Sequence, residues 1–392
     1  CAGQILDSDT CFNILLGSCA GRCLNSGDSN IVMGKQAGNQ LTSGCYNIFF
    51  GDCAGKNTTT GKYNLALGTG ALQNGTVTGN YNTTFGYGAG WNVCSGSHNF
   101  FGGYNAGCCI TSGGCNIFIG KQAGKKSTTG TFNIAIGEGA VSNCNLTGGN
   151  NIALGRNAGY FTSGGGCNLF LGLQAGKYAN SNDGIALGRE ALAASWGGAA
   201  SSGNDNIAIG CQAAYKMTSG NTNITIGKSA GRCITTGYQN IYLGENAGFG
   251  HSSAATGNNN IALGQGAGYA ICCAQHSVFL GTEAGYCNKI GKRNIYVGCG
   301  AGRCRGQSGG DDNVALGQLA LRGSAVVANN TGGHNIAIGE ESGFGLTSGN
   351  YNTFIGYESG FMATTSSDNI GIGRCTLGGN AGQNTTGSEN RK

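Results

Sequence analysis

Cysteine and histidine are the residues here that could bind a metal or act as nucleophiles, yet their spacing forms no recognisable site. The chain has 20 cysteines but no C-x-x-C pair, and its four histidines are far apart, so no zinc site is predicted. No carboxylate pair, Ser-His-Asp set or Cys-His pair is singled out by its context. The GxGxxG-like strings arise from a repeat and precede no helix that could bind phosphate. We therefore expect no enzymatic activity, no metal and no cofactor.

Disulfide formation is the chemistry that the cysteines do favour. Twenty cysteines in 392 residues is high for a cytosolic protein and predicts an extracellular or cell-surface location. Cys287 and Cys304 occupy the same position in consecutive repeats, so their Cα atoms could lie about 5 Å apart, a spacing that a disulfide tolerates. The alternative is that they are free thiols filling a small apolar position. Cys1 and Cys375, near the two ends, are candidates for bonds between subunits, with lipidation as an alternative for Cys1.

Asparagine is the residue that recurs most regularly. A unit that reads Asn-Ile-x-Ile/Leu-Gly-x-x-Ala-Gly, followed by Thr-Ser/Thr-Gly, repeats with a period of 17 residues, and Gly184 and Ser277 replace the asparagine in two units. Stacked amides can donate to and accept from one another, so these anchor asparagines predict a structural ladder. Its best-placed members are Asn13, Asn30, Asn47, Asn64, Asn116, Asn133, Asn223, Asn240, Asn294 and Asn352.

The elements that position these residues are expected to be short strands. Residues 133–137 (Asn-Ile-Ala-Ile-Gly) are typical, and no unit shows the 3.6-residue pattern of a helix. With 79 glycines and no proline, the chain can turn tightly while every residue keeps its N–H donor. The sequence predicts an all-β fold, a parallel β-solenoid of about 21 coils in a single domain over residues 1–392. Longer loops are expected near residues 190–203, 249–257 and 322–333.

The strands are apolar at alternate and at intervening positions, which indicates burial on both faces. We expect the middle residue of each strand to lie on the outer face and to pack against another copy of the chain. The residues predicted for this self-association face are Phe49, Ala66, Phe118, Ala135, Phe170, Tyr242 and Tyr296. The alternative is that alanine, common at this position, is merely small and tolerated.

The motif Asn-Ile-Ala-Ile-Gly at residues 133–137 resembles the Asn-Ser-Val-Ala-Ile-Gly repeat of the YadA-like heads of trimeric autotransporter adhesins, and similar repeats occur in phage and large-virus fibre proteins. The resemblance covers nearly the whole chain. It implies a left-handed parallel β-roll that assembles as a homotrimer with the repeated strand facing the axis.

The two ends lack polar caps. Residues 1–3 match residues 19–21, in mid-coil, and the chain stops just after Asn390. Two subunits placed end to end could complete a coil between them, which predicts head-to-tail polymerisation. The alternative is a fragment of a longer repeat protein.

The charge and hydropathy of the chain argue against two classes of partner, nucleic acids and the interior of a lipid bilayer. The net charge of +5 is small and the basic residues are scattered, so nucleic-acid binding is not expected. No apolar run approaches the roughly 20 residues that span a bilayer. We expect a structural subunit of an extracellular fibre that partners with itself.

Two alternative functions remain open at this point. An adhesin, or a receptor-binding fibre on a virion, would bind a cell-surface or glycan receptor through the loops around Trp196, His251 and Val326. An ice- or ligand-binding face would use a threonine column, formed by Thr42, Thr111, Thr128, Thr162, Thr218, Thr235 and Thr347.

Overall fold

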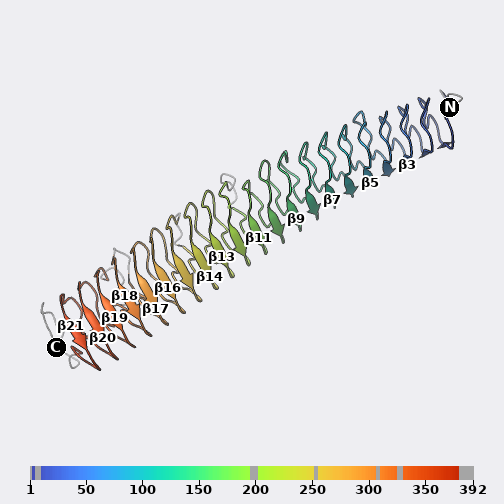
Figure 1. Cartoon of the computed structure of the whole chain (residues 1–392). Helices are drawn as coiled ribbons and strands as arrows, with labels where there is room; N and C mark the ends of the chain where they lie inside the picture. The colour runs from blue at the N-terminus through green and yellow to red at the C-terminus, as the bar shows by residue number, and fades with distance from the viewer. Residues whose placement is uncertain are drawn as a thin grey trace. The chain divides into compact units, whose positions relative to one another are not determined.

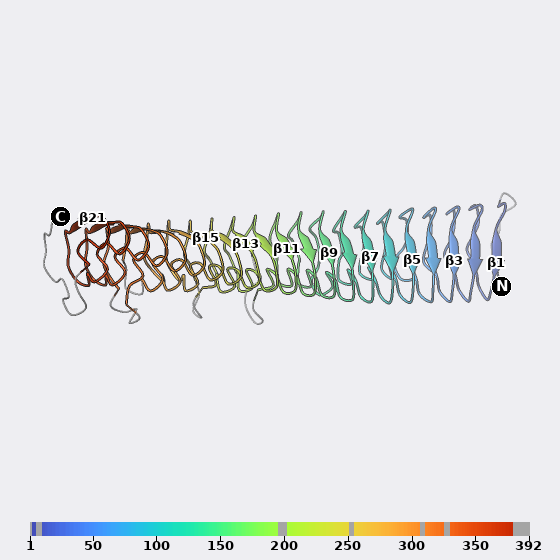
Figure 2. The same ribbon diagram turned by 90° about the horizontal axis from the view of Figure 1, so that it is seen from below.

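The computed structural model describes residues 2–4, 10–194, 202–250, 255–305, 310–324 and 330–378. The chain divides into two compact units, Cys1–Arg189 and Glu190–Lys392, here called the first and second units. Each unit is a stack of short parallel strands, one per coil, and Figures 1 and 2 show the strand arrows of each unit in a single row. The expectation of one continuous domain stays a prediction.

The strands of the first unit are all three residues long. They are β1 (Ile14–Leu16), β2 (Ile31–Met33), β3 (Ile48–Phe50), β4 (Leu65–Leu67), β5 (Thr83–Phe85), β6 (Phe100–Gly102), β7 (Ile117–Ile119), β8 (Ile134–Ile136), β9 (Ile152–Leu154), β10 (Leu169–Leu171) and β11 (Ile185–Leu187).

The second unit has the same construction. Its strands are β12 (Ile207–Ile209), β13 (Ile224–Ile226), β14 (Ile241–Leu243), β15 (Ile261–Leu263), β16 (Val278–Leu280), β17 (Ile295–Val297), β18 (Val314–Leu316), β19 (Ile336–Ile338), β20 (Thr353–Ile355) and β21 (Ile370–Ile372). The described residues contain no helix.

Every strand begins directly after an anchor position, and within each unit successive strands pair in parallel through equivalent residues. In β7 and β8, for example, Ile117 pairs with Ile134 and Ile119 with Ile136. The predicted all-β parallel solenoid with a period of about 17 residues is therefore confirmed. The middle parts of the three expected longer loops, including Trp196, His251 and Val326, lie outside the described residues.

A glycine closes each strand because the stacked turn leaves no room for a side chain. Gly120 follows β7 with a φ of 128°, which disfavours residues that carry a Cβ. A Cβ at this position would lie 2.7 Å from the carbonyl oxygen of Gly137 in the next coil. The glycine column therefore allows successive coils to approach at strand-pairing distance.

The anchor asparagines form a continuous ladder of hydrogen bonds inside each unit. Asn116 Nδ2 donates to Asn99 Oδ1 (3.0 Å) and to Gly130 O (2.9 Å). Asn116 Oδ1 accepts from the backbone N–H (3.0 Å) and from Nδ2 (3.3 Å) of Asn133. The Asn116 amide thus makes four hydrogen bonds, two to the side chains of neighbouring anchors and two to the backbone.

All ten asparagines predicted from the sequence lie in this ladder: Asn13, Asn30, Asn47, Asn64, Asn116, Asn133, Asn223, Asn240, Asn294 and Asn352. At the two positions where another residue replaces the anchor asparagine, a backbone N–H group still forms a hydrogen bond between consecutive coils. Gly184 N–H donates to Asn168 Oδ1 (2.9 Å), and Ser277 Oγ accepts from Asn294 N–H (3.2 Å).

The ladder also decides which strand residues point inward, and it overturns the predicted self-association residues. The anchor is buried, so strand alternation turns the residue two positions later inward as well. The seven residues assigned to an outer face line the interior instead, each 0% exposed: Phe49, Ala66, Phe118, Ala135, Phe170, Tyr242 and Tyr296. The first and third residues of each strand are the ones that face outward.

The interior combines side chains of different size from coil to coil. At Phe118 the facing positions are small: Gly124 lies against the ring and Ser127 is buried beside it. Where the central residue is Ala337, the position equivalent to Ser127 is Leu346, also fully buried. Other coils bury two large residues at this pair of positions, as with Phe101 and Ile110. The coils of Phe118 and Ala337 therefore fill a similar space with different pairs of residues.

The ladder predicts a graded cost of substitution at Asn133. Asn133→Ala leaves the N–H and Nδ2 of Asn151 without their acceptor, and should lower the free energy of unfolding by about 2–4 kcal/mol. Asn133→Ser should cost less, because a hydroxyl can accept the next backbone N–H as Ser277 does. Urea unfolding followed by circular dichroism measures both, and equal costs for the two variants would contradict the ladder.

The interior predicts that two substitutions compensate each other. Phe118→Ala should cost about 3–5 kcal/mol through the cavity it leaves. Ser127→Leu alone should cost about 1–3 kcal/mol because the leucine overpacks against the phenylalanine ring. The double variant reproduces the Ala337 and Leu346 arrangement and should be more stable than Phe118→Ala alone. A double-mutant cycle of unfolding free energies tests this, and simple additivity would refute the balance.

Candidate functional site: an apolar sheet face with polar borders

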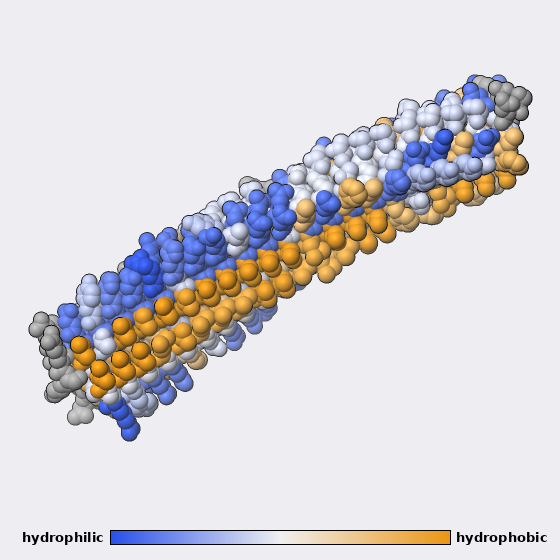
Figure 3. Space-filling view, in the orientation of Figure 1, coloured by the Kyte–Doolittle hydropathy of each residue, from blue (hydrophilic) through white to orange (hydrophobic). Residues whose placement is uncertain are grey.

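The most extended chemical feature of each unit is the outward surface of its strands. We define the apolar face as the first and third residues of every strand. These positions carry Ile, Leu, Val, Met or Phe throughout, except at Thr83, Gly102 and Thr353, and none is charged. Figure 3 shows them as adjacent orange rows. A sheet surface that faced only water would alternate with polar residues, so this face is built to be covered.

The first unit exposes the larger part of this face. Ten of its residues are between 37% and 60% exposed: Ile14, Leu16, Ile48, Phe50, Phe85, Phe100, Ile117, Ile119, Ile136 and Leu171. At roughly 150–200 Å² per whole side chain, these ten leave on the order of 700–900 Å² of apolar surface in solvent. That exceeds the roughly 300–600 Å² of the largest apolar patch on a typical monomer.

The second unit exposes fewer residues of the same face to this degree. They are Ile226, Ile295, Ile336, Ile338, Ile370 and Ile372, between 37% and 60% exposed. The difference arises at the sequence level, since phenylalanine occupies outward positions in β3, β5 and β6 but in no strand of the second unit.

A column of side chains borders the face on the side where the strands begin. We call it the border column; it consists of the residue directly before each anchor. These residues adopt left-handed backbone angles, for example a φ of 58° at Tyr63, and their side chains turn outward. Tyr46, Tyr63, Tyr81 and His98 stack in sequence with ring centroids 4.8–4.9 Å apart. In the first unit the border column thus widens the apolar face with aromatic rings.

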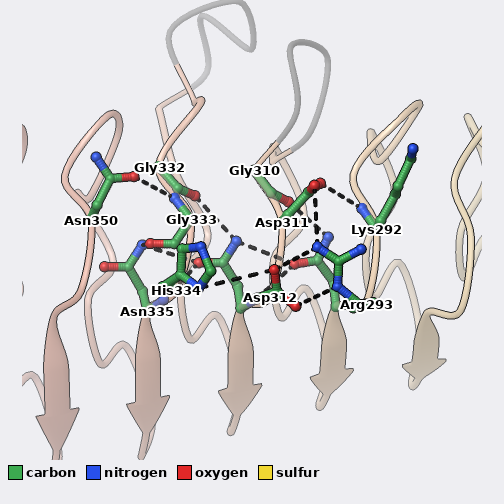
Figure 4. A network of polar contacts seen from close by, with 12 residues as sticks. Lys292, Arg293, Gly310, Asp311, Asp312, Gly332, Gly333, His334, Asn335 and Asn350 are labelled. Atoms are coloured by element: carbon green, nitrogen blue, oxygen red, sulfur yellow. Dashed lines mark hydrogen bonds and ion pairs between the residues drawn. The ribbon is translucent and has the colours of Figure 1, made fainter.

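In the second unit the border column becomes an ion-pair network (Figure 4). Arg293 Nε and Nη2 donate to the two carboxylate oxygens of Asp312 at 2.6 and 2.7 Å, and Asp311 lies 3.6 Å from the same guanidinium. His334 lies beyond Asp312, with Nδ1 3.9 Å from the carboxylate, and its ring stacks on Tyr351 at 4.8 Å. The Arg293 hydrogen bonds hold the pKa of Asp312 below its usual value.

Charged residues border the opposite side of the face in several coils, at the position one residue after the strand-closing glycine. Lys121 and Glu138 form an ion pair at 3.1 Å between consecutive coils of the first unit, and Lys228 and Glu245 do so at 3.0 Å in the second. An apolar centre flanked by polar groups that satisfy one another is the usual anatomy of a protein–protein interface.

A second outward feature is a column of stacked aromatic and arginine side chains in the second unit. We call it the arginine–aromatic column; its members are Tyr215, Arg232, Phe249, Tyr269, Tyr286, Arg303, Arg322, Phe344 and Phe361. A groove of about 230 Å³ beside it is lined by Asn246, Gln265, Gly266, Tyr269, Thr282, Glu283 and Tyr286. The rings cover one another's faces, so the groove offers hydrogen-bonding groups and ring edges.

The hydroxyl groups of the threonine column considered for ice or ligand binding form hydrogen bonds within the chain. Thr42 Oγ1 donates to the carbonyl of Thr59 (3.1 Å), and Thr218 Oγ1 donates to the carbonyl of Thr235 (3.2 Å), each one coil further on. Thr347 repeats the contact with Thr364 at 2.9 Å. These hydroxyl groups stabilise the stack of turns.

The cysteines of the described residues are all free thiols. Cys287 and Cys304 lie in consecutive coils, as the repeat predicts, and each thiol shifts the pKa of the other. The disulfide between them stays a prediction. Cys375 is exposed and its thiol donates to Glu358 Oε2 at 3.4 Å, while Cys1 lies outside the described residues.

The sequence predicts the ladder correctly but assigns the outward face to the central strand residues, which are buried, instead of to the residues on either side of them. The missed residues are the outward pairs such as Ile117 and Ile119, together with the border column. The signal was available, because a buried anchor and strict alternation together turn the central residue inward. Nothing in the sequence marked the left-handed residue before the anchor, which is Tyr, Asp, Cys or Thr in different coils.

Comparison with models of known protein families, with curated proteins and with solved structures finds no match for this chain. Within the described residues, no helix has the length and apolar character needed to cross a lipid bilayer. The same residues contain no cluster of three or more His, Cys, Asp or Glu side chains that could hold a metal ion.

The ion-pair network predicts an acid-dependent contribution to stability. Because the folded-state pKa of Asp312 is lowered, its pairing with Arg293 stabilises the fold fully above the unfolded pKa of about 3.9 and loses this effect as the pH falls through the folded-state value. Asp312→Asn should therefore melt below the wild type at neutral pH, with the gap closing in acid. Melting temperature against pH measures this. Asp368→Asn, at the equivalent border position outside the network, is the control, and a pH-independent gap at Asp312 would contradict the assignment.

Proposed function

We propose that this chain is a structural subunit of an extracellular fibre and that copies of it associate laterally through the apolar face. The observation that carries the proposal is the uncharged double row of outward Ile, Leu, Val and Phe side chains, exposed over strand after strand. Burying such a surface is the dominant favourable term in protein association.

The exposed area has the size that a stable interface needs. The ten most exposed face residues of the first unit supply on the order of 700–900 Å², and a standard interface buries about 800 Å² per partner. The remaining, less exposed face residues add to this area. A partner must therefore present an equally long, flat and apolar surface.

A second copy of the chain presents such a surface. Its side-chain rows repeat at the strand spacing of about 4.8 Å, so ridges on one copy can enter grooves on the other along the whole contact. The paired charges at the borders, such as Lys121 with Glu138, are already neutralised within each chain and can remain in solvent at the rim. The resemblance to YadA-like heads, whose repeated strand faces a threefold axis, supports a trimer.

The hydrogen bonds of the recurring polar side chains support a structural role, because these side chains hold the coils together. The recurring amides and hydroxyls of the ladder and the threonine column are engaged in bonds between coils, as at Asn116 and Thr42. The high cysteine content supports an extracellular location.

Charge placed on the apolar face should separate the copies. Ile119→Lys with Ile136→Lys puts two cations on adjacent coils at the centre of the face. Both side chains already point outward, so the fold should be kept, while the buried charges should weaken association by at least 100-fold, about 2.7 kcal/mol.

Sedimentation equilibrium of wild type and variant measures this. Ser112→Lys, at an exposed turn position away from the face, is the matched control and should assemble as the wild type does. A wild type that remains monomeric at high concentration, or a double variant that assembles unchanged, would refute lateral association through this face.

A further inference from the structure

The interior of the second unit becomes polar in the two coils that follow β16 and β17. Asn288 and Arg305 occupy the inward position that carries an apolar residue in many other coils, for example Leu41 or Leu346, and both are 0% exposed. The Arg305 guanidinium donates to the carbonyls of Gly332 (2.9 Å) and Leu346 (3.1 Å). Within the described residues, Arg305 Nε and both amide atoms of Asn288 have no hydrogen-bond partner. Buried polar groups without partners reduce stability, so this stretch of the stack is a weak point.

A pair of thiols lies directly beside this stretch. Cys287 precedes Asn288 and Cys304 precedes Arg305 in the chain. The Cys287 N–H donates to Arg303 O at 2.9 Å and the Cys304 N–H to Arg322 O at 2.9 Å, so the two cysteines occupy neighbouring levels of one backbone ladder. Levels about 4.8 Å apart lie within the Cα separation of about 4.4–6.8 Å that disulfides adopt.

The two thiols differ in their electrostatic surroundings. The neighbouring Cys287 thiol and the guanidinium groups of Arg322 and Arg303 together lower the pKa of Cys304 to about 6. The interaction with Cys304, with burial, raises the pKa of Cys287. Arg303 is held in place by Glu283 at 2.6 Å. One sulfur is thus prepared as a thiolate nucleophile and the other as a protonated partner.

We propose that Cys304 and Cys287 form an oxidisable staple, in which a small peroxide converts the pair to a disulfide that joins two consecutive coils at the polar stretch of the interior. The role of the staple is to keep the coils that carry Asn288 and Arg305 from opening. Reduction would release this constraint at one place in the stack.

The chemistry balances with one peroxide per pair. The Cys304 thiolate attacks a peroxide oxygen, the S–O bond forms as the O–O bond breaks, and the departing hydroxide takes up a proton to become water. The Cys287 sulfur then attacks the sulfenic sulfur of Cys304, the S–S bond forms as the S–O bond breaks, and the Cys287 proton leaves with the hydroxide as water. Two thiols lose two electrons in total, and these reduce the peroxide.

The chain contains two internal comparisons. Cys233 occupies the equivalent position in its own coil, but its neighbours above and below are Gly250 and Lys216, so it has no resolving thiol. Cys108 and Cys109 have their sulfur atoms 3.5 Å apart, but they are adjacent in sequence, so a bond between them would join no two coils.

Peroxide treatment of the full chain followed by peptide mapping tests the chemistry. The wild type should yield a peptide pair linked through Cys287 and Cys304, with little sulfenic acid trapped by dimedone. Cys287→Ser should instead accumulate the dimedone adduct at Cys304, while Cys304→Ser should give no adduct at Cys287. Cys233→Ser should form the linked pair as the wild type does. Absence of the linked pair, or adducts equally distributed between the two sulfurs, would overturn the proposal.

Hydrogen exchange tests the staple. Amides of residues 287–288 and 304–305 should exchange roughly 100-fold more slowly in the oxidised than in the reduced wild type, since the bond closes a loop of 17 residues. The double variant Cys287→Ser/Cys304→Ser should show no change on oxidation, which separates this pair from the other cysteines. A linked pair with unchanged local exchange would refute the stapling role.

Discussion

The amide ladder is the interaction on which the rest of this structure depends. The anchor asparagines after Asn13 are buried with two donors and an acceptor oxygen that water cannot reach, so they must find their partners in the coils on either side. That requirement holds even where the loop between two anchors is longer: Asn335 lies 22 residues after Asn313, yet its N–H and Nδ2 still bond to the Asn313 side chain at 3.1 and 3.0 Å. Extra residues are therefore accommodated outside the ladder.

Burial of the anchor has a second consequence, through strand alternation. The central strand residue shares the anchor's side and must fit a space that also holds glycine or a second side chain from the returning segment, as Phe118 does with Gly124. The two remaining strand residues have only the outside to face. Their apolar character therefore belongs to the surface of the molecule, and this is what connects the ladder to lateral assembly.

The polar interior near β16 and β17 shows how much variation this architecture tolerates. Arg305 extends past the level of its own coil to reach carbonyl groups of later coils, 27 and 41 residues away in sequence. An apolar interior would need no such bridging. In the same two coils, Cys287 and Cys304 directly precede Asn288 and Arg305. A disulfide between them would therefore join the coils whose interior is polar.

The sequence alone determined the period, the strands, the ladder and the stacking of Cys287 on Cys304, because all of these follow from local patterns repeated every 17 residues. Hydropathy did not distinguish Ile117 from Phe118, since both are apolar, so the inward side of the strand follows only once the anchor is known to be buried. The closed coil of the tertiary structure encloses the anchor, and strand alternation then turns Phe118 inward. Contacts such as the hydrogen bond from Cys304 N–H to Arg322 O likewise depend on how coils of unequal length align in space.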